Sequence, residues 1–386
     1  MRIGEDHSDL REGVRNICKR YPGSYWRDLE ARSAYPSEFV DDLTKAGFLA
    51  ALIPVDFGGS GLPLRGAAAI LEEINGAGCT ATQCHAQMYI MATLLRHGSA
   101  EQKHRYLPRI ASGEWRLQAF GVTETESGSE TTNIRTSAEK VGNSHYVING
   151  HKVWISRALH SDLMLLLART TPIEQVKKRS DGLSVFIIDI PQSLDKGLII
   201  KPLEAMINHN STELFFDKLP VPAENLIGQE GQGLRYMMEG MNAERILVAS
   251  AAIGDGRWFL TKAVAYANSR VVFGRSIGAN QGVQFPIARA YAELEAADMM
   301  CRRAAALFDR GLPCGAEAAI AKLLASEAAW KAAEVAMQTF GGFNYAKEYD
   351  LERKWREVRL YQIAPVSTNL ALSFIAQQVL GMERSY

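Results

Sequence analysis

Residues 146–156 read Tyr-Val-Ile-Asn-Gly-His-Lys-Val-Trp-Ile-Ser and carry the clearest β signal in the chain. β-Branched and aromatic residues, which favour extended backbone, lie on both sides of Asn149-Gly150. Because an Asn-Gly pair supplies the positive φ angles of a type I′ turn, we expect a β-hairpin that turns at these two residues. The middle of the chain is therefore predicted to be β structure.

The same β-type sequence pattern extends in both directions, from about Arg116 to Ile227. Apolar runs are short here, rich in Val, Ile and aromatic residues, and interrupted by Gly, Asn and Asp. Further strands are expected at 163–168 and 183–190. Residues 228–233 are rich in glycine but lack the GxGxxG order and do not lie in a βαβ unit, so we interpret them as a turn.

The segments on either side of this region have helical periodicity. Before residue 113, Pro36 suits the first turn of a helix that Gly47 ends. After Gly233, the alanine-rich segment 317–339 is the clearest helix, and Gly341-Gly342 ends it. The other helices are expected at 10–17, 64–76, 83–96, 237–253 and 285–309. The sequence thus predicts an α+β multidomain chain with an N-terminal helical domain (1–115), a central β domain (116–227) and a C-terminal helical bundle (228–386).

Composition excludes several classes of partner. The chain has 386 residues, of which 47% are hydrophobic and 22% charged, as in ordinary globular proteins. Its 43 basic and 43 acidic residues cancel, which argues against nucleic acid as a partner, because phosphate binding needs a basic surplus. No apolar run reaches the roughly 18 residues of a membrane span, and the charged N-terminus is unlike a signal peptide, so a soluble, cytoplasmic protein is expected.

The 5 cysteines are odd in number and show no CxxC spacing, which favours a reducing compartment over a disulfide framework. Cys79, Cys84 and His85 have the residue types of metal ligands. Since no second ligand pair follows, we interpret them as small buried residues at a helix start, and no metal is expected.

Five segments, in order, resemble the acyl-CoA dehydrogenase family, and the resemblance covers nearly the whole chain. Residues 120–130 (FGVTETESGSE) are similar to the family's TEP-x-AGSD loop, and 152–156 (KVWIS) to its KxWIT/S segment. The other matching segments are 270–274 with 280–281 and 284–285, 338–342, and 359–363. The resemblance implies an N-terminal α-bundle, a central β-barrel and a C-terminal four-helix bundle.

The resemblance also implies a bound FAD. Trp154 would pack on the flavin ring while the Thr123 and Ser156 hydroxyls bond its edge, because a protein tunes a flavin through such contacts. Arg270 would hold the pyrophosphate with its forked donors. The full set of implied FAD positions is Phe120, Val122, Thr123, Trp154, Ile155, Ser156, Arg270, Phe273, Gln281, Gln338, Gly341, Gly342 and Ser367. Taken alone, Trp154 could instead be a core aromatic residue of the barrel.

In this family the arginine reaches the FAD of a neighbouring subunit, and Gln338 with Gly341-Gly342 lines the same nucleotide. A helix C-cap is the simpler interpretation of the two glycines, and both roles are compatible. A FAD site shared between chains makes oligomerisation obligatory, and the resemblance implies a homotetramer.

The catalytic base departs from the commonest family pattern. The segment where most members carry the glutamate of YEGT reads Ala364-Pro365-Val366-Ser367 here. A subset of the family, including isovaleryl-CoA and long-chain types, carries it in a helical ER-[LI] motif, which matches Glu244-Arg245-Ile246. Glu244 is therefore the candidate base, because a buried carboxylate has a pKa raised toward neutrality. The alternative is a Glu–Arg pair on a solvated helix face, which the apolar run after Arg245 disfavours.

Two further departures concern the substrate. Pro365 lacks the backbone N–H that polarises the thioester carbonyl in the family, so the donor must be Val366 N–H, a flavin ribityl hydroxyl, or a differently held substrate. Arg157 follows Ser156 where TNG is common, and the sequence assigns it no role. By resemblance, Ser129, Asn242 and Arg245 contact the substrate.

The expected reaction is α,β-dehydrogenation of an acyl-CoA thioester, with electrons passed to an electron-transfer flavoprotein. The same fold is also compatible with a carrier-protein-bound acyl substrate, with an oxidase or monooxygenase, or with a catalytically silent flavin-binding partner subunit. A purely structural helical protein would leave the Thr123–Ser129 and Trp154–Ser156 segments unexplained.

Overall fold

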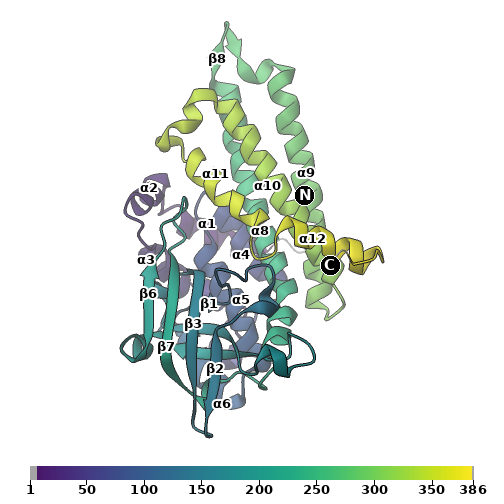
Figure 1. The fold of residues 1–386 in the computed structure, drawn as a ribbon. Helices are drawn as coiled ribbons and strands as arrows, with labels where there is room; N and C mark the ends of the chain where they lie inside the picture. The colour runs from purple at the N-terminus through teal and green to yellow at the C-terminus, as the bar shows by residue number, and fades with distance from the viewer. Residues whose placement is uncertain (1–6, 385–386) are drawn as a thin grey trace. The chain divides into compact units, whose positions relative to one another are not determined.

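The computed structural model describes residues 7–384 and confirms the predicted fold class: helical, then β, then helical (Figure 1). The first helices are α1 (Ser8–Cys18), α2 (Gly23–Ala31), α3 (Ser37–Lys45), α4 (Leu64–Gly76), α5 (Thr82–His97) and α6 (Ala100–Ser112). Helix α2 was not predicted, because Pro22 and Gly23 at its start are typical turn residues. The division of the chain into domains at residues 115 and 227 stays a prediction.

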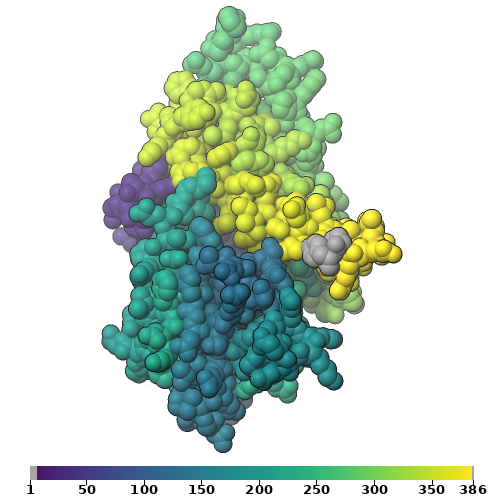
Figure 2. Space-filling view, viewed as in Figure 1, coloured from purple at the N-terminus to yellow at the C-terminus, as the bar shows by residue number. Residues whose placement is uncertain are grey.

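The central strands form one curled sheet. They are β1 (Leu117–Gly121), β2 (Ser137–Val141), β3 (His145–Ser156), β4 (Leu163–Arg169), β5 (Leu183–Asp189), β6 (Leu198–Pro202) and β7 (Ser211–Pro222). Their order is β1-β4-β2-β3-β7-β6, with β5 paired to β4. In the space-filling view the strand residues form one continuous blue-to-teal block (Figure 2).

The predicted hairpin at Asn149-Gly150 is wrong. Strand β3 runs straight through this pair, and its register against β7 shifts between Ile148 and Gly150. A Cβ on Gly150 would lie 2.5 Å from the hydroxyl oxygen of Thr136, the residue before β2, so only glycine fits beside the start of that paired strand. The Asn149 side chain accepts a hydrogen bond from Lys218 N at 2.8 Å, so the pair forms an irregularity within a long strand instead of a turn.

Helices resume after the sheet. They are α8 (Gly233–Ser269), α9 (Gln281–Asp309), α10 (Gly315–Phe340), α11 (Leu351–Arg359) and α12 (Thr368–Phe374), with the short strands β8 (Val271–Val272) and β9 (Arg275–Ser276) between α8 and α9. Helix α8 is much longer than predicted, since it continues for 37 residues through several glycines. Within residues 7–384, none of the helices combines the length and hydropathy that a membrane span requires.

The chain packs as two compact units, each built from segments far apart in sequence. The first comprises the described residues of Met1–Arg32, Leu62–Ala81 and Asn242–Tyr386, and the second comprises Ser33–Gly61 and Thr82–Met241. The sheet therefore belongs to the second unit. Its two faces carry separate apolar clusters: Leu163 packs with residues of α5 and α6, whereas Met164 packs inside the curl with β3 and β7.

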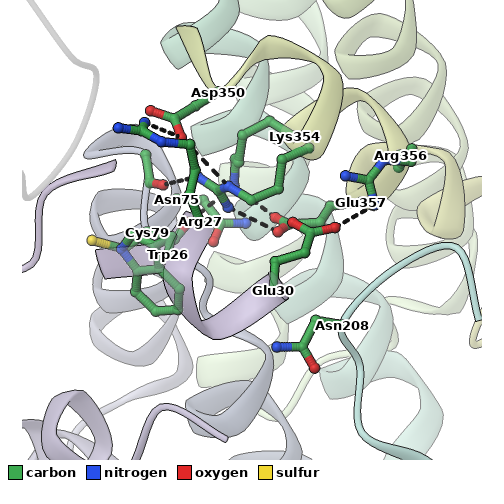
Figure 3. Close-up of polar contacts among 12 residues, drawn as sticks. Trp26, Arg27, Glu30, Asn75, Cys79, Asn208, Asp350, Lys354, Arg356 and Glu357 are labelled. Atoms are coloured by element: carbon green, nitrogen blue, oxygen red, sulfur yellow. Dashed lines mark hydrogen bonds and ion pairs between the residues drawn. The ribbon is translucent and has the colours of Figure 1, made fainter. Parts of the chain in front are cut away.

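The first unit contains a buried ion-pair network centred on Lys354 of α11 (Figure 3). Lys354 Nζ forms an ion pair with Asp255, lies 3.2 Å from Glu357, and donates to Cys79 O at 2.9 Å. Asp255 also accepts hydrogen bonds from Tyr361 and Asn75, at 2.8 and 3.0 Å. Because both lysine and aspartate are fully buried, each ion depends on the other for its solvation.

Candidate active site

Trp154 stands at the surface of the second unit, near the end of β3. Its side chain is 57% exposed and its φ is 62°, in the left-handed region that a bulky residue rarely adopts. Val153 N donates to Thr123 O at 3.0 Å, which places the loop after β1 beside Trp154. The alternative that Trp154 is a core aromatic residue is therefore wrong, and its indole is free to face a ligand.

The residues close to Trp154 differ in how far their side chains are exposed to solvent. Ile155 is buried inside the sheet and its carbonyl accepts from Thr212, whereas Ser156 and Thr123 are only half-buried. The second unit thus presents an aromatic wall and two hydroxyls on one side of β3. Phe120 and Val122 are half-buried and pack on the apolar cluster of α5 and α6.

A buried ion pair that the sequence analysis did not assign holds this loop. Lys152 Nζ, fully buried, lies 2.8 Å from Glu124 Oε1 and 2.9 Å from Val122 O. The Glu124 carboxylate also accepts from the backbone N–H groups of Arg135 and Thr136, at 2.7 and 2.9 Å. Burial lowers the pKa of Lys152 to about 8 despite Glu124. Lys152 and Glu124 both lie within the segments that resemble the family. Their position there was the one feature of the sequence that could have pointed to this ion pair.

Ser129 is exposed at the end of the same loop. Ser127, two residues earlier, is buried and donates to Glu130 O at 2.6 Å, so the loop is held in a tight turn that leaves Ser129 accessible.

Glu244 lies on α8 in the first unit and is 8% exposed. Burial raises its pKa to about 8, although the nearby Arg245 guanidinium acts in the opposite direction. Its carboxylate makes no hydrogen bond or ion pair within residues 7–384. The prediction that this helix face is buried is confirmed. A buried carboxylate without a fixed partner is suited to accepting a proton.

Asn242 and Arg245 lie beside Glu244. Arg245 donates to Asn242 Oδ1 at 3.2 Å, and its guanidinium stands 5.5 Å from the Phe374 ring centroid. A Cβ on Gly315 would lie 3.7 Å from Phe374 and 3.9 Å from Asn242, so α8, α10 and α12 meet here with little spare room.

The loop 364–367, which lacks the glutamate of most family members, is held in place by a side chain of α10. Lys322, almost fully buried, donates to Val366 O, and burial lowers the pKa of Lys322 to about 8. Val366 N–H has no partner within residues 7–384. The Ser367 hydroxyl caps α12 by accepting from Leu370 N at 3.3 Å, which occupies the side chain predicted to contact FAD.

Arg270 and the Gly341-Gly342 segment, both predicted to bind the nucleotide, come together where α8 and α10 end. The Arg270 guanidinium lies 5.7 Å from the Phe343 ring, and Tyr266 stacks on Phe340 at 4.0 Å. Gly341 has a φ of 57°, and nothing lies within 4 Å of a Cβ placed on Gly341 or Gly342. The other predicted residues in this region, Phe273, Gln281 and Gln338, are exposed. A backbone open to close approach beside an arginine without an ion-pair partner in the described chain fits a pyrophosphate.

Comparison with known proteins identifies the family. Family models described as the N-terminal, middle and C-terminal domains of acyl-CoA dehydrogenase match residues 4–114, 119–219 and 231–380. The chain is 34% identical to acyl-CoA dehydrogenase FadE12 of Mycobacterium tuberculosis, over 99% of this chain and 98% of that protein. The fold matches a glutaryl-coenzyme A dehydrogenase in complex with glutaryl-CoA (TM-score 0.91, 31% identity, 100% and 98% coverage). It also matches the prolyl acyl carrier protein oxidase AnaB (TM-score 0.90, 25% identity, 99% and 100% coverage). The chain belongs to the acyl-CoA dehydrogenase family of oxidoreductases.

Proposed function

We propose that this enzyme catalyses FAD-dependent α,β-dehydrogenation of an acyl-CoA thioester and passes the electrons to an electron-transfer flavoprotein. The observation that carries the proposal is Glu244, a buried carboxylate with a raised pKa and no fixed partner, in a chain of this family. Bound FAD would supply the acceptor for the hydride that leaves the β-carbon.

FAD would be held by the chain's own residues in two groups. Trp154, Thr123 and Ser156 would contact the flavin ring, and Lys152 with Glu124 would keep their loop in place. Arg270 and Gly341-Gly342 would bind the pyrophosphate of a second copy's FAD, so that a homotetramer completes each site. The exposed Phe273 and Val271 support this, since such apolar side chains on an exposed hairpin suit an interface.

Glu244 would remove the α-proton of the thioester. Its low exposure limits water, and the same burial favours the protonated product of the transfer, which is uncharged. Val366 N–H would polarise the thioester carbonyl in place of the donor that Pro365 lacks. Lys322, which donates to Val366 O, would hold the adjoining Val366–Ser367 peptide of the same loop.

The rate of flavin reduction should therefore depend on pH. Below about pH 8 the value of kcat/KM for an acyl-CoA should fall about tenfold per pH unit, because Glu244 with its pKa of about 8 must be ionised to act as base. Stopped-flow reduction between pH 6 and 9.5 measures this. A profile that is level down to pH 6 would contradict the assignment.

The pyrophosphate assignment is tested by FAD affinity. Arg270→Met should weaken FAD binding about 10–100-fold, because charge-assisted hydrogen bonds to the pyrophosphate are lost. Flavin uptake by the deflavinated protein measures the change. Arg275→Met, on the same β8–β9 hairpin, is the matched control and should bind FAD like wild type. Equal loss in both variants would argue against a specific contact.

A second candidate keeps the fold and changes the substrate carrier or the electron acceptor. The similarity to a prolyl acyl carrier protein oxidase and the proline at position 365 favour it. Reduction by a carrier-protein-bound acyl group with O₂ turnover, and no reduction by any acyl-CoA, would establish this candidate. A silent partner subunit would instead leave the flavin oxidised with both kinds of thioester.

A cytoplasmic location is proposed with the same function. All 5 cysteines are buried and none of them forms a disulfide bond within residues 7–384, which suits a reducing compartment.

A further inference from the structure

Arg157 is a buried cation without an anion. Its side chain is 4% exposed, yet no carboxylate in residues 7–384 forms an ion pair with it. The two arginines that are buried as deeply as Arg157 differ: Arg11 lies 2.6 Å from Glu72, and Arg353 lies 2.9 Å from Glu357. Since an unpaired buried charge is costly, the arrangement at Arg157 needs an explanation.

The groups around Arg157 are neutral. Its Nη1 lies 3.3 Å from His209 Nε2, which must be the acceptor and therefore unprotonated. Burial, reinforced by Arg157, lowers the pKa of His85 to about 3 and also lowers the pKa of His160 and His209. Among the described residues, the only acidic groups that interact electrostatically with Arg157 are the phenols of Tyr35 and Tyr89. The cluster thus carries one net positive charge at neutral pH.

Three nitrogen atoms in this cluster are buried without a hydrogen-bond partner. They are Arg157 Nε, His85 Nε2 and Gln118 Nε2. Tyr35 connects two of these residues, because its hydroxyl donates to Gln118 Oε1 at 2.7 Å and the same phenol group interacts electrostatically with Arg157. Arg157 Nε and Gln118 Nε2 are donors, and His85 Nε2 donates in the tautomer that carries its proton there. Such donors, beside a guanidinium that has no carboxylate partner in the described residues, indicate a missing acceptor that carries negative charge.

The backbone fixes Arg157 in place. Its φ is 60°, and this left-handed conformation is held by three hydrogen bonds: Arg157 N to Asn210 O at 2.8 Å, His160 N to Arg157 O at 3.0 Å, and the Ser161 hydroxyl to Arg157 O at 2.8 Å. A position this constrained presents the guanidinium in one direction. His85 and Tyr89 are only partly buried, so their side of the cluster is the one nearest to solvent.

We infer that Arg157, His85 and Gln118 form a binding site for a carboxylate group. A planar monoanion matches the fork of the guanidinium and cancels its single charge, whereas a phosphate dianion would leave a net negative charge among neutral imidazoles. Resting on the proposed function, the inference extends to the substrate: Arg157 directly follows Ser156, so the carboxylate is the far end of an ω-carboxyl acyl chain. The substrate class is then a dicarboxylic acyl-CoA.

The site itself is tested with glutarate on the FAD holoenzyme, by calorimetric titration. Wild type should bind glutarate in preference to glutaramide, and Arg157→Met should weaken glutarate binding about 100-fold, with partial recovery in Arg157→Lys. Arg135→Met, an exposed arginine of the same unit, is the control and should bind like wild type. Absence of glutarate binding, or equal binding by Arg157→Met, overturns the site.

Thermal stability separates binding from a structural role. Without ligand, Arg157→Met should unfold at the same temperature as wild type or higher, because it removes an unpaired buried charge. A marked fall in the unfolding temperature would mean that Arg157 holds the fold, and would overturn the inference.

The substrate class is tested by flavin reduction with glutaryl-CoA and valeryl-CoA. Wild type should prefer glutaryl-CoA through KM by about 100-fold, and Arg157→Met should lose that preference while still reacting with valeryl-CoA. Equal KM values in wild type would overturn the ω-carboxyl assignment and leave only a site for free carboxylates. If no thioester reduces the flavin although glutarate still binds through Arg157, the proposed function fails and the site stands.

Discussion

Replacing Glu244 by Gln should slow reduction of the flavin by an acyl-CoA about 10²–10⁴-fold, because Gln keeps the shape of the side chain but cannot accept the α-proton. Anaerobic stopped-flow reduction under saturating substrate measures the effect. Binding should change little, since the carboxylate makes no hydrogen bond within residues 7–384 that substitution would break. The loss should therefore appear in kcat and not in KM.

The stability of this variant provides an internal check. The pKa of Glu244 is raised in the folded protein, so its stabilising contribution is present at acidic pH and is lost as pH rises through about 8. Glu244→Gln should thus be at least as stable as wild type above pH 8. Glu239→Gln, an exposed glutamate on the same helix, should retain wild-type activity. An active Glu244→Gln enzyme would remove Glu244 from the mechanism.

Replacing Lys354 by Met should lower the free energy of unfolding by about 3–5 kcal/mol, because it removes the cation that the buried Asp255 and the half-buried Glu357 carboxylates share. Lys354 also donates to Cys79 O, so one buried carbonyl loses its donor. Chemical denaturation at pH 7 measures the change, and a shift in the midpoint without a change in slope would identify a true loss of stability.

Lys331→Met is the matched control for that experiment. Lys331 pairs with Glu293, but the two side chains are 43% and 40% exposed, so water screens the pair and replaces it easily. Its loss should cost at most about 1 kcal/mol. A similar loss of unfolding free energy in the two variants would mean that the buried Lys354 ion pairs stabilise the fold no more than an exposed pair does.

The fold class was accessible from the sequence because periodicity changes sharply at the ends of the β region. Secondary structure predicted from short sequence signals was wrong where tertiary packing imposed a different conformation. Asn149-Gly150 is a strong turn signal, yet β2 and β7 pair on both sides of β3 and keep it extended through Gly150. Helix α2 was not predicted because its first residues are typical of a turn, although nine helical residues begin there.

The candidate site was accessible mainly through resemblance, and its physical details were not. Sequence alone could not separate an exposed Trp154 from a core aromatic residue, because β3 departs from strict alternation at its left-handed residue. The Lys152–Glu124 pair joins positions 28 apart, and the cluster around Arg157 joins α5 to the loops after β3 and β6. No sequence period connects such positions. The roles assigned to the FAD and substrate residues stay predictions.

The most direct test is an anaerobic titration of the purified yellow protein with acyl-CoAs that differ in the group at the far end of the acyl chain. The product of each reaction is then analysed. The account predicts that an acyl-CoA bleaches the flavin and yields the corresponding α,β-enoyl-CoA, and that Glu244→Gln binds the same ligand without bleaching. A wild-type flavin that stays oxidised with every acyl-CoA, or a Glu244→Gln flavin that bleaches as fast as wild type, would contradict it.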